Sequence, residues 1–210
     1  MKCSLLKQYL SGEKGRVLFI GTFKSGKSSL INALLREKLL PVGCLSTTAV
    51  VTTLYYSEHT EAFYVEKTGA VYSTTLEKAL EFCKIRSKDL SGIVRYDVKE
   101  VRIGIPNPFL SGGLVIKDTA GIGDDGAFTE EVWNEVSVCE FIVVVLNAVR
   151  FLSQEERRIL DKLQEIGKHN LFIYINFTEE LEKEDLLEII AYIRRQIAGC
   201  VLIELKQMIL

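Results

Sequence analysis

The segment Gly21–Ser28 constrains the fold of this chain more than any other, because its residues have the order of a phosphate-binding loop. It contains Gly-Thr-Phe-Lys-Ser-Gly-Lys-Ser and directly follows the apolar run Val17–Ile20. The two glycines allow a tight turn whose backbone N–H groups point at phosphate oxygens, and a helix that begins at Lys27 adds the positive end of its dipole. The sequence therefore predicts a buried strand, a phosphate loop and a helix, in this order.

The polar residues of this loop have defined roles in such a site. Lys27 is expected to reach the β- and γ-phosphates of a nucleotide and to act in catalysis, and the hydroxyl of Ser28 to occupy one place in the shell of a Mg²⁺ ion. The alternative is a glycine turn without function, which leaves the strand and helix around the loop unexplained. We expect nucleotide contacts from Gly21, Phe23, Lys24, Ser25, Gly26, Lys27, Ser28 and Ser29.

The composition indicates one globular domain, 1–210, that binds no nucleic acid. Hydrophobic residues make up 48% of the 210 residues and charged residues 26%, which excludes a disordered chain. A formal net charge of −2 provides no basic field for a nucleic acid backbone. The five cysteines have no Cys-x-x-Cys spacing, which is typical of reduced thiols in the cytoplasm. No apolar run approaches the roughly 18 residues of a membrane-spanning helix.

Apolar runs alternate with amphipathic helical patterns along most of the chain, as they do where crossover helices join parallel strands. The sequence predicts an α/β P-loop fold, with a mixed, largely parallel central sheet and helices on both faces. Ser153 and Glu156 have the spacing of a capping box at the start of one helix. Core strands are expected at Val17–Ile20, Leu114–Lys117, Phe141–Leu146 and Leu171–Ile175. Helices are expected at Lys27–Arg36, Glu130–Val138, Gln154–Ile166 and Glu184–Ile197.

A β-rich section separates the first of these helices from the strand Leu114–Lys117. It holds three partly alternating stretches, and a helical pattern at Thr75–Ile85 follows the turn Thr68-Gly69. We expect the three stretches to be antiparallel strands that extend the parallel core. They are Val50–Tyr56, Glu61–Glu66 and Lys99–Ile105.

A second part of the site is expected where Asp118-Thr119-Ala120-Gly121 follows a core strand, because open α/β sheets bind ligands beyond the carboxyl ends of their strands. Asp118 is placed to hold Mg²⁺ through water, and the N–H of Gly121 to contact the γ-phosphate. As an alternative, Asp118 caps a turn. The phosphate loop upstream favours the metal role.

A further Mg²⁺ ligand is expected from a segment that senses the γ-phosphate, between the first helix and the next strand. Ser46-Thr47-Thr48 lies there. Thr48 is the first choice as metal ligand and as a member of the catalytic set, and Thr47 is the second. Because threonine is also a good strand former, a purely structural role for both hydroxyls is the alternative.

One order of motifs runs through nearly the whole chain, in the sequence Gly21–Leu35, Leu40–Val50, Ile105–Leu110 and Asp118–Gly121. This order and spacing resemble the large GTPases of the dynamin superfamily, and bacterial dynamin-like proteins in particular. The resemblance implies a Mg²⁺-dependent domain that binds GTP and hydrolyses it to GDP and phosphate after two such domains pair across the nucleotide face. It also implies that 1–12 and 206–210 are stubs of a flanking helical segment.

Three loop positions depart from that family's pattern. Ala120 replaces the usual proline, and Phe23 stands where dynamin places a glutamine that positions the catalytic water. Lys24 occupies the position where the similar atlastins and guanylate-binding proteins carry an arginine finger. The resemblance therefore implies a catalytic role for Lys24 as a point charge, without the bidentate fork of arginine. A solvated side chain is the alternative.

Guanine recognition in this class comes from Asn/Thr-Lys-x-Asp after a core strand, where this chain has Asn176-Phe177-Thr178-Glu179. The Glu179 carboxylate can accept the same two hydrogen bonds from guanine, but its side chain has one more methylene to immobilise. The ring of Phe177 replaces the lysine stem as a surface for the purine. With Asn176, these residues favour GTP over ATP, and a decayed base site is an equal alternative.

Two other functions stay open from the sequence. A regulatory or scaffolding module that binds nucleotide with little hydrolysis fits the altered base motif and the missing glutamine, and a P-loop ATPase is the third possibility. The expected partners are GTP, Mg²⁺ and a second copy of the chain. The expected location is the cytoplasm, with peripheral attachment to a membrane only in a longer chain.

Overall fold

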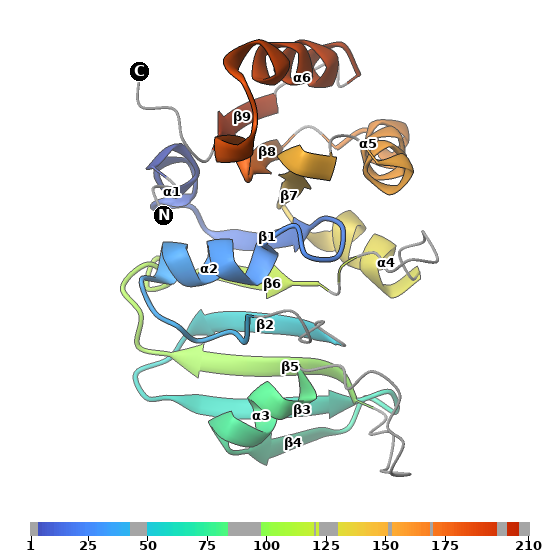
Figure 1. Ribbon diagram of the computed structural model, residues 1–210. Coiled ribbons are helices and arrows are strands. Elements are labelled where there is room, and N and C mark those ends of the chain that lie inside the picture. Colours follow the sequence, from blue (N-terminus) through green and yellow to red (C-terminus); the bar gives the residue numbers. More distant parts are fainter. Residues whose placement is uncertain are drawn as a thin grey trace, which may run out of the picture.

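The computed structural model contains a nine-stranded sheet with helices on both faces (Figure 1). It describes residues 4–42, 50–83, 98–119, 121, 130–150, 153–168, 170–196 and 201–205. Within these residues the strands lie in the order β4-β3-β5-β2-β6-β1-β7-β8-β9. The predicted α/β fold with a mixed sheet is confirmed.

The parallel half of the sheet holds the predicted core strands. β1 pairs parallel with β6 on one side and with β7 on the other, and β8 and β9 follow in the same direction. Most residues of β1, β7 and β8 are buried, because helices cover both faces of these near-continuous apolar runs. The strands are β6 (Leu114–Asp118), β1 (Gly15–Ile20), β7 (Phe141–Asn147), β8 (Leu171–Asn176) and β9 (Val201–Leu205).

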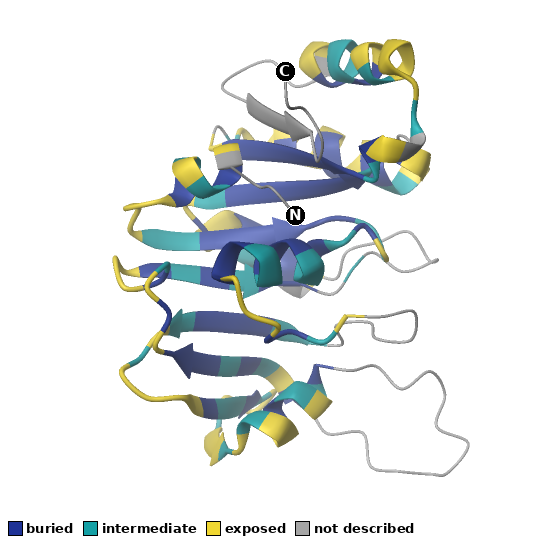
Figure 2. Ribbon diagram, turned by 60° about the vertical axis from the view of Figure 1, so that its left-hand side comes forward, coloured by how far each residue is buried: buried dark blue, intermediate teal, exposed yellow. Residues whose placement is uncertain are grey.

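Two hydrophobic clusters fill the two faces of this half. Side chains alternate along β1, so Val17 and Phe19 pack with α1 and α2, whereas Leu18 and Ile20 pack with α4, α5 and α6. Figure 2 shows the central strands as buried and the outer sides of the helices as exposed. The helices are α1 (Ser4–Leu10), α2 (Lys27–Leu35), α4 (Glu130–Val138), α5 (Gln154–Ile166) and α6 (Lys183–Gln196).

The β-rich section extends the sheet as predicted, but the prediction that it is antiparallel throughout is wrong, and it contains a further strand, β4, that was not predicted. β2 pairs antiparallel with β6, and β3 pairs antiparallel with both β4 and β5. One pair in the extension, β2 with β5, is parallel. β4 and β5 run in the same direction, and α3 supplies the crossover that such a connection needs. The elements are β2 (Val51–Tyr56), β3 (Glu61–Glu66), β4 (Val71–Thr74), α3 (Leu76–Phe82) and β5 (Val98–Ile105).

The helix α1 lies within the segment 1–12, which was expected to be the stub of a flanking helical segment, yet its side chains enter the core of the domain. Leu6 and Leu10 are fully buried. The ring of Tyr9 contacts those of Phe141 and Phe172, with ring centroids 5.8 Å and 5.4 Å apart. The first described helix therefore contributes to the packing of β7 and β8.

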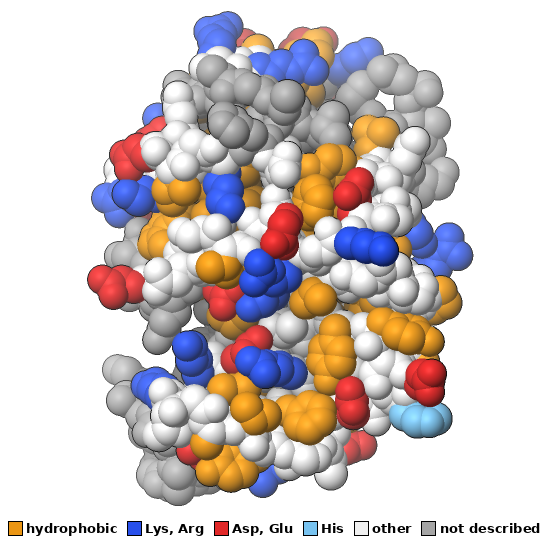
Figure 3. Space-filling model, turned by 180° about the vertical axis from the view of Figure 1, so that it is seen from behind, with side chains coloured by type: hydrophobic (Ala, Val, Ile, Leu, Met, Phe, Trp, Pro, Cys, Tyr) orange, Lys and Arg blue, Asp and Glu red, His pale blue; other side chains and the backbone are white. Residues whose placement is uncertain are grey.

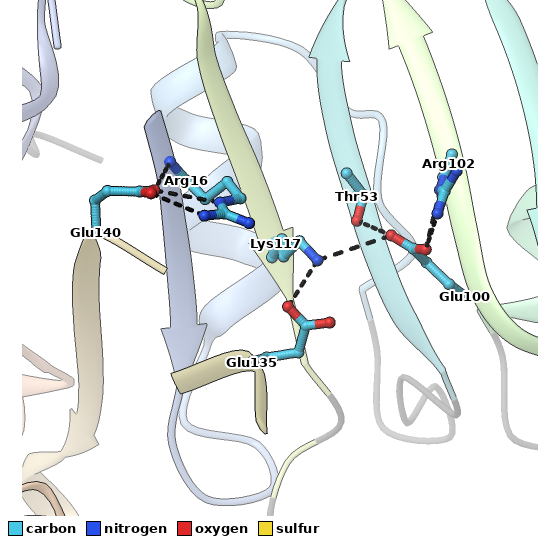
Figure 4. Close-up of polar contacts among 7 residues, drawn as sticks. All are labelled: Arg16, Thr53, Glu100, Arg102, Lys117, Glu135 and Glu140. Carbon is cyan, nitrogen blue, oxygen red and sulfur yellow. Dashed lines mark hydrogen bonds and ion pairs between the residues drawn. The ribbon is translucent and has the colours of Figure 1, made fainter. Parts of the chain in front are cut away.

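A polar cluster joins β6 to α4 and to the extension (Figure 4). The ammonium group of Lys117 donates to Oε2 of Glu135 at 2.7 Å and lies 3.9 Å from Oε1 of Glu100. Glu100 also accepts hydrogen bonds from Arg102 and from Thr53 of β2. Burial alone would raise the pKa of Glu100, but these hydrogen bonds and the Lys117 charge lower it. Through Lys117, β6 is therefore linked both to α4 and to β5.

The face seen in Figure 3 carries positively and negatively charged side chains interspersed with hydrophobic ones. Such a face provides no large field of one sign to attract a long polyanion. Within the described part of the chain, no helix is both long and apolar enough to cross a bilayer.

We predict that Leu6→Ala lowers the free energy of unfolding by about 2–4 kcal/mol, because it leaves a cavity under α1. Leu5→Ala, on the same helix but 54% exposed, should change it by less than about 0.5 kcal/mol. Urea denaturation of both variants measures the two values. Equal losses in the two variants would contradict the described packing of α1.

Candidate functional site

The phosphate loop connects β1 to α2 in a conformation that depends on its two glycines. Gly26 precedes α2 with φ +96°, a left-handed conformation that favours glycine. A Cβ atom there would lie 2.2 Å from the side-chain nitrogen of Asn176, and one on Gly21 would lie 2.3 Å from the carbonyl oxygen of Val145. Side chains at either position would therefore displace the loop from β7 and β8.

Lys27 begins α2 and turns its side chain back into the loop. Its ammonium group donates to the carbonyl oxygens of Gly21 and Thr22, at 3.0 Å each, and the residue is 7% exposed. Burial lowers the pKa of Lys27 to about 8, against the opposite effect of the Asp118 charge. A cation at the N-terminus of a helix is suited to bind phosphate oxygens.

Ser28 and Asp118 were predicted as metal ligands, and the structure brings them together. Oγ of Ser28 donates to Oδ2 of Asp118 at 2.7 Å, because the pairing of Phe19 with Asp118 places the end of β6 beside the loop. Asp118 is 1% exposed, and its Oδ1 has no hydrogen-bond partner among the described residues. Burial raises the pKa of Asp118 to about 6, although the Lys27 charge and the Ser28 hydroxyl lower it.

This donor set fits a Mg²⁺ ion that shares its shell with a substrate. A buried carboxylate oxygen without a partner and a neighbouring hydroxyl are hard oxygen ligands, and Mg²⁺ completes its shell with water and phosphate oxygens. Among the described residues, no group of three or more His, Cys, Asp and Glu side chains is placed to hold a metal without such help. Thr48 and its alternative Thr47 lie outside the described residues.

Gly121, which was predicted to contact the γ-phosphate, lies against the phosphate loop. A Cβ atom on it would lie 2.7 Å from Cα of Phe23 and 3.1 Å from the ammonium nitrogen of Lys27. The hydroxyl of Thr119 donates to the carbonyl oxygen of Phe19 at 2.9 Å, which fixes the chain as it leaves β6. Ala120 lies outside the described residues.

The outer part of the loop carries a second cation. Lys24 is exposed, has φ +59°, and places its ammonium nitrogen 5.3 Å from the ring centroid of the half-buried Phe23. Ser25 is fully buried, and its Oγ has no hydrogen-bond partner among the described residues. Ser29 lies half-buried in the first turn of α2. The predicted loop residues are therefore together, with Lys24 at the solvent side and Lys27 inside.

The predicted base motif lies next to the loop, at the end of β8. The side chain of Asn176 donates to the carbonyl oxygen of Ser25 at 3.0 Å and accepts from the N–H of Phe177 at 3.1 Å. Phe177 has φ +60° and leads into the short 3₁₀ helix η2 (Thr178–Glu180), which contains the exposed Glu179. Asn176 thus holds the loop, and Phe177 and Glu179, which were predicted to contact the base, lie one and three positions after it.

One residue in contact with the loop was not predicted to be there. Oε1 of Glu156, on α5, accepts a hydrogen bond from the hydroxyl of Thr22 at 3.4 Å. The sequence indicated only a capping role, because Ser153 and Glu156 have that spacing. The cap itself is confirmed, since Ser153 Oγ accepts from the Glu156 N–H at 3.3 Å. No local pattern indicated the contact with the loop.

Comparison with known proteins identifies the family of this chain. A model of the dynamin family matches residues 17–177, which include the loop, Asp118 and the start of the base motif. The chain is 28% identical over 188 residues to an uncharacterized protein in the xynA 3′ region of Caldicellulosiruptor, covering 89% of this chain and 46% of that protein. It is 29% identical over 181 residues to the transmembrane GTPase Marf of Drosophila melanogaster, covering 83% of this chain and 22% of Marf.

A solved structure of an oligomerised bacterial dynamin pair has a similar fold, with a TM-score of 0.66 and 22% identity. The similarity covers 97% of this chain and 33% of that one. The chain thus spans about half the length of the first of these curated relatives and about a fifth of the second. The family model spans most of the chain and all of the described phosphate loop, so the chain belongs to the dynamin family and has the fold of a P-loop GTPase domain.

Proposed function

We propose that this domain binds GTP with Mg²⁺ and hydrolyses it to GDP and phosphate, and that pairing of two domains activates hydrolysis. The observation that carries the proposal is the cluster of Lys27, Ser28 and Asp118 at the start of α2, in which a buried carboxylate oxygen has no hydrogen-bond partner in the described part of the chain. Such a cluster costs stability unless a ligand with both a cation and phosphate groups completes it. Membership of the dynamin family supports GTP as that ligand.

Catalysis in this proposal comes from positioning and charge. Lys27 and the loop N–H groups hold the β- and γ-phosphates, and Ser28, Asp118 and Thr48 would hold Mg²⁺, which offsets the charge that develops on the phosphate oxygens. Water attacks the γ-phosphorus in line, and the bond to the oxygen that bridges the β- and γ-phosphorus atoms breaks. The N–H of Gly121 orients the γ-phosphate. Gly121 and Thr48 would therefore respond to its loss.

The outer loop supplies the remaining charge. Lys24 is exposed beside Phe23, where a nucleotide phosphate or a second domain is able to reach it. Its ammonium group would stabilise the transition state as a point charge. Phe23 has no group to orient water, so this task would fall to other residues or to the partner domain.

The base would lie against Asn176, Phe177 and Glu179. Asn176 donates to the loop carbonyl of Ser25, which supports a position of the next residues close to a nucleotide held by the loop. The carboxylate of Glu179 would accept hydrogen bonds from guanine, whereas adenine offers its amino group at another position. This supports GTP over ATP.

The proposed partner is a second copy of the chain, with its nucleotide face against the first. The fold shared with an oligomerised bacterial dynamin pair supports oligomerisation as a property of such domains. The charges of both signs on the face seen in Figure 3 support the expectation that the protein binds no nucleic acid. A cytoplasmic location, with peripheral attachment to a membrane only in a longer chain, completes the proposal.

A second candidate function is a regulatory module that binds nucleotide with little hydrolysis. The observation that favours it is Phe23, an apolar ring that lies beside the Lys24 ammonium group at the position where a water-orienting side chain is expected. Binding and turnover measurements separate the two candidates, and ATP as a competing ligand separates both from a P-loop ATPase.

We predict that the wild-type chain binds GTP and GDP more tightly than ATP in the presence of Mg²⁺, as measured by calorimetric titration. Lys27→Ala should weaken GTP binding by about 30-fold or more, because charged hydrogen bonds to phosphate are lost. Lys38→Ala, which removes an exposed lysine after α2, is the matched control and should bind as the wild type does. Unchanged affinity in Lys27→Ala would refute the site assignment.

We predict that phosphate release per molecule rises with protein concentration, because paired domains complete each other's sites. Lys24→Ala should lower the rate at high concentration, and Lys24→Arg should retain it, since the charge is kept. A rate per molecule that stays constant across concentrations contradicts activation by pairing. Tight GTP binding without phosphate release at any protein concentration would support the regulatory module instead.

A further inference from the structure

A buried carboxylate lies directly behind the phosphate loop. Glu156 is 1% exposed, and its Oε1 accepts hydrogen bonds from the backbone N–H of Asn147 at 3.0 Å and from the hydroxyl of Thr22 at 3.4 Å. These contacts join three elements, which are α5, the end of β7 and the loop. Glu156 therefore links the loop to the opposite face of the sheet from α2.

The helix cap does not account for this placement. Ser153 is the N-cap of α5, and its own N–H donates to the carbonyl oxygen of Arg150 at 3.1 Å. The neighbouring carboxylate of Glu155 is bonded to its own backbone N–H and to the Ser153 hydroxyl, which lower its pKa. An acidic group already serves the first turn, so the buried position of Glu156 needs another reason.

Burial of a carboxylate is costly unless hydrogen bonds and a favourable field offset the cost. The N-terminus of α5 provides such a field for Glu156, and Asn147 and Thr22 provide hydrogen bonds. The contact with Thr22 is the one that reaches the site. The hydroxyl of Thr22 therefore points at a buried carboxyl group.

Thr22 is also the residue whose backbone organises the loop. Its carbonyl oxygen accepts from the Ser25 N–H at 3.2 Å and from the Lys27 ammonium group at 3.0 Å. A shift of Thr22 would move the acceptor of Lys27 and the turn that aims the loop N–H groups at phosphate. The chain of contacts from Glu156 to Lys27 thus passes through one residue.

We propose that Glu156 is a positioning residue of the nucleotide site, which holds Thr22 and through it the phosphate loop in the conformation that binds phosphate. This proposal rests on the proposed function, because it assigns Glu156 a part in nucleotide binding at that same site. Glu156 does not touch the nucleotide. It acts by keeping the phosphate loop ordered in the ligand-free protein.

The test measures GDP affinity, with Mg²⁺, for variants at both ends of the contact. Glu156→Gln keeps the shape and removes the charge, and Thr22→Val keeps the shape and removes the hydroxyl. Each should weaken GDP binding by about five- to tenfold, which is the order of a hydrogen bond to a charged group. The double variant should be no weaker than the weaker single variant, because both changes break one contact.

Two conservative variants are the matched controls. Thr22→Ser keeps the hydroxyl, and Glu155→Gln removes a charge from the same turn of α5, so both should bind GDP within about twofold of the wild type. The free energy of unfolding of each variant is measured beside its affinity. A purely structural role would lower stability and leave the affinity of the folded molecules unchanged, and this result would overturn the proposal.

The remaining outcomes are also decisive. Additive effects of the two changes would mean that Glu156 and Thr22 act separately, which contradicts the proposed chain of contacts. If Glu156→Gln does not fold, Thr22→Val against Thr22→Ser still decides the question. A wild-type chain that binds neither GDP nor GTP would refute the proposed function and this proposal with it. If the wild type binds GDP and the Glu156→Gln and Thr22→Val variants bind it equally well, only this proposal is refuted.

Discussion

Two opposite charges, the Lys27 ammonium and the Asp118 carboxylate, are buried together at the end of the sheet, and the site depends on them. Burial favours the neutral form of both groups. It lowers the pKa of Lys27 to about 8 and raises the pKa of Asp118 to about 6. Only the parallel pairing of β1 with β6, which sets Phe19 beside Asp118, brings these residues together across the sequence. The fold therefore maintains charges that are only partly compensated, and this is the usual physical mark of a binding site.

The rest of the structure holds the loop around these charges. Asn176, at the end of β8, donates to the loop carbonyl of Ser25, and Glu156 accepts from Thr22 on the other side. Gly121 closes over the loop from β6 at a distance that leaves no room for a side chain. The loop is therefore held by contacts with the residues that end or follow the parallel strands and with α5. On the other edge of β6, strand β2 pairs with it, and Lys117 of β6 forms an ion pair with Glu100 of β5.

Local patterns were sufficient to predict the parallel core and the phosphate loop, because apolar runs, two motif glycines and helix caps carry that information in consecutive residues. The contact of Ser28 with Asp118 was also predictable, since both follow strands that run in parallel. The helix Ser4–Leu10 lies in a segment that was expected to be helical but to flank the domain. Its packing against β7 and β8 was not predicted, because so short a segment gives a weak periodicity. The role of Glu156 was missed because a capping pattern already explained it, and only the packing of α5 against the loop reveals the second contact. Glu179 and Thr48 stay predictions.

The titration of Asp118 shows whether this buried cluster is completed by Mg²⁺ and a nucleotide. In the ligand-free chain its raised pKa means that the folded state binds the proton more tightly than the unfolded state, so the stability from this group is present at about pH 4 and is lost as the pH rises to about 6. Carbon-13 NMR of the Asp118 carboxyl group, assigned with Asp118→Asn, should give a pKa of about 6 in the ligand-free chain. Saturating Mg²⁺ and GDP should abolish titration between about pH 5 and about pH 7, because a nearby cation favours the ionised carboxylate. A pKa that stays at about 6 under saturating Mg²⁺ and GDP, or one that is ordinary in the ligand-free chain, would contradict the account.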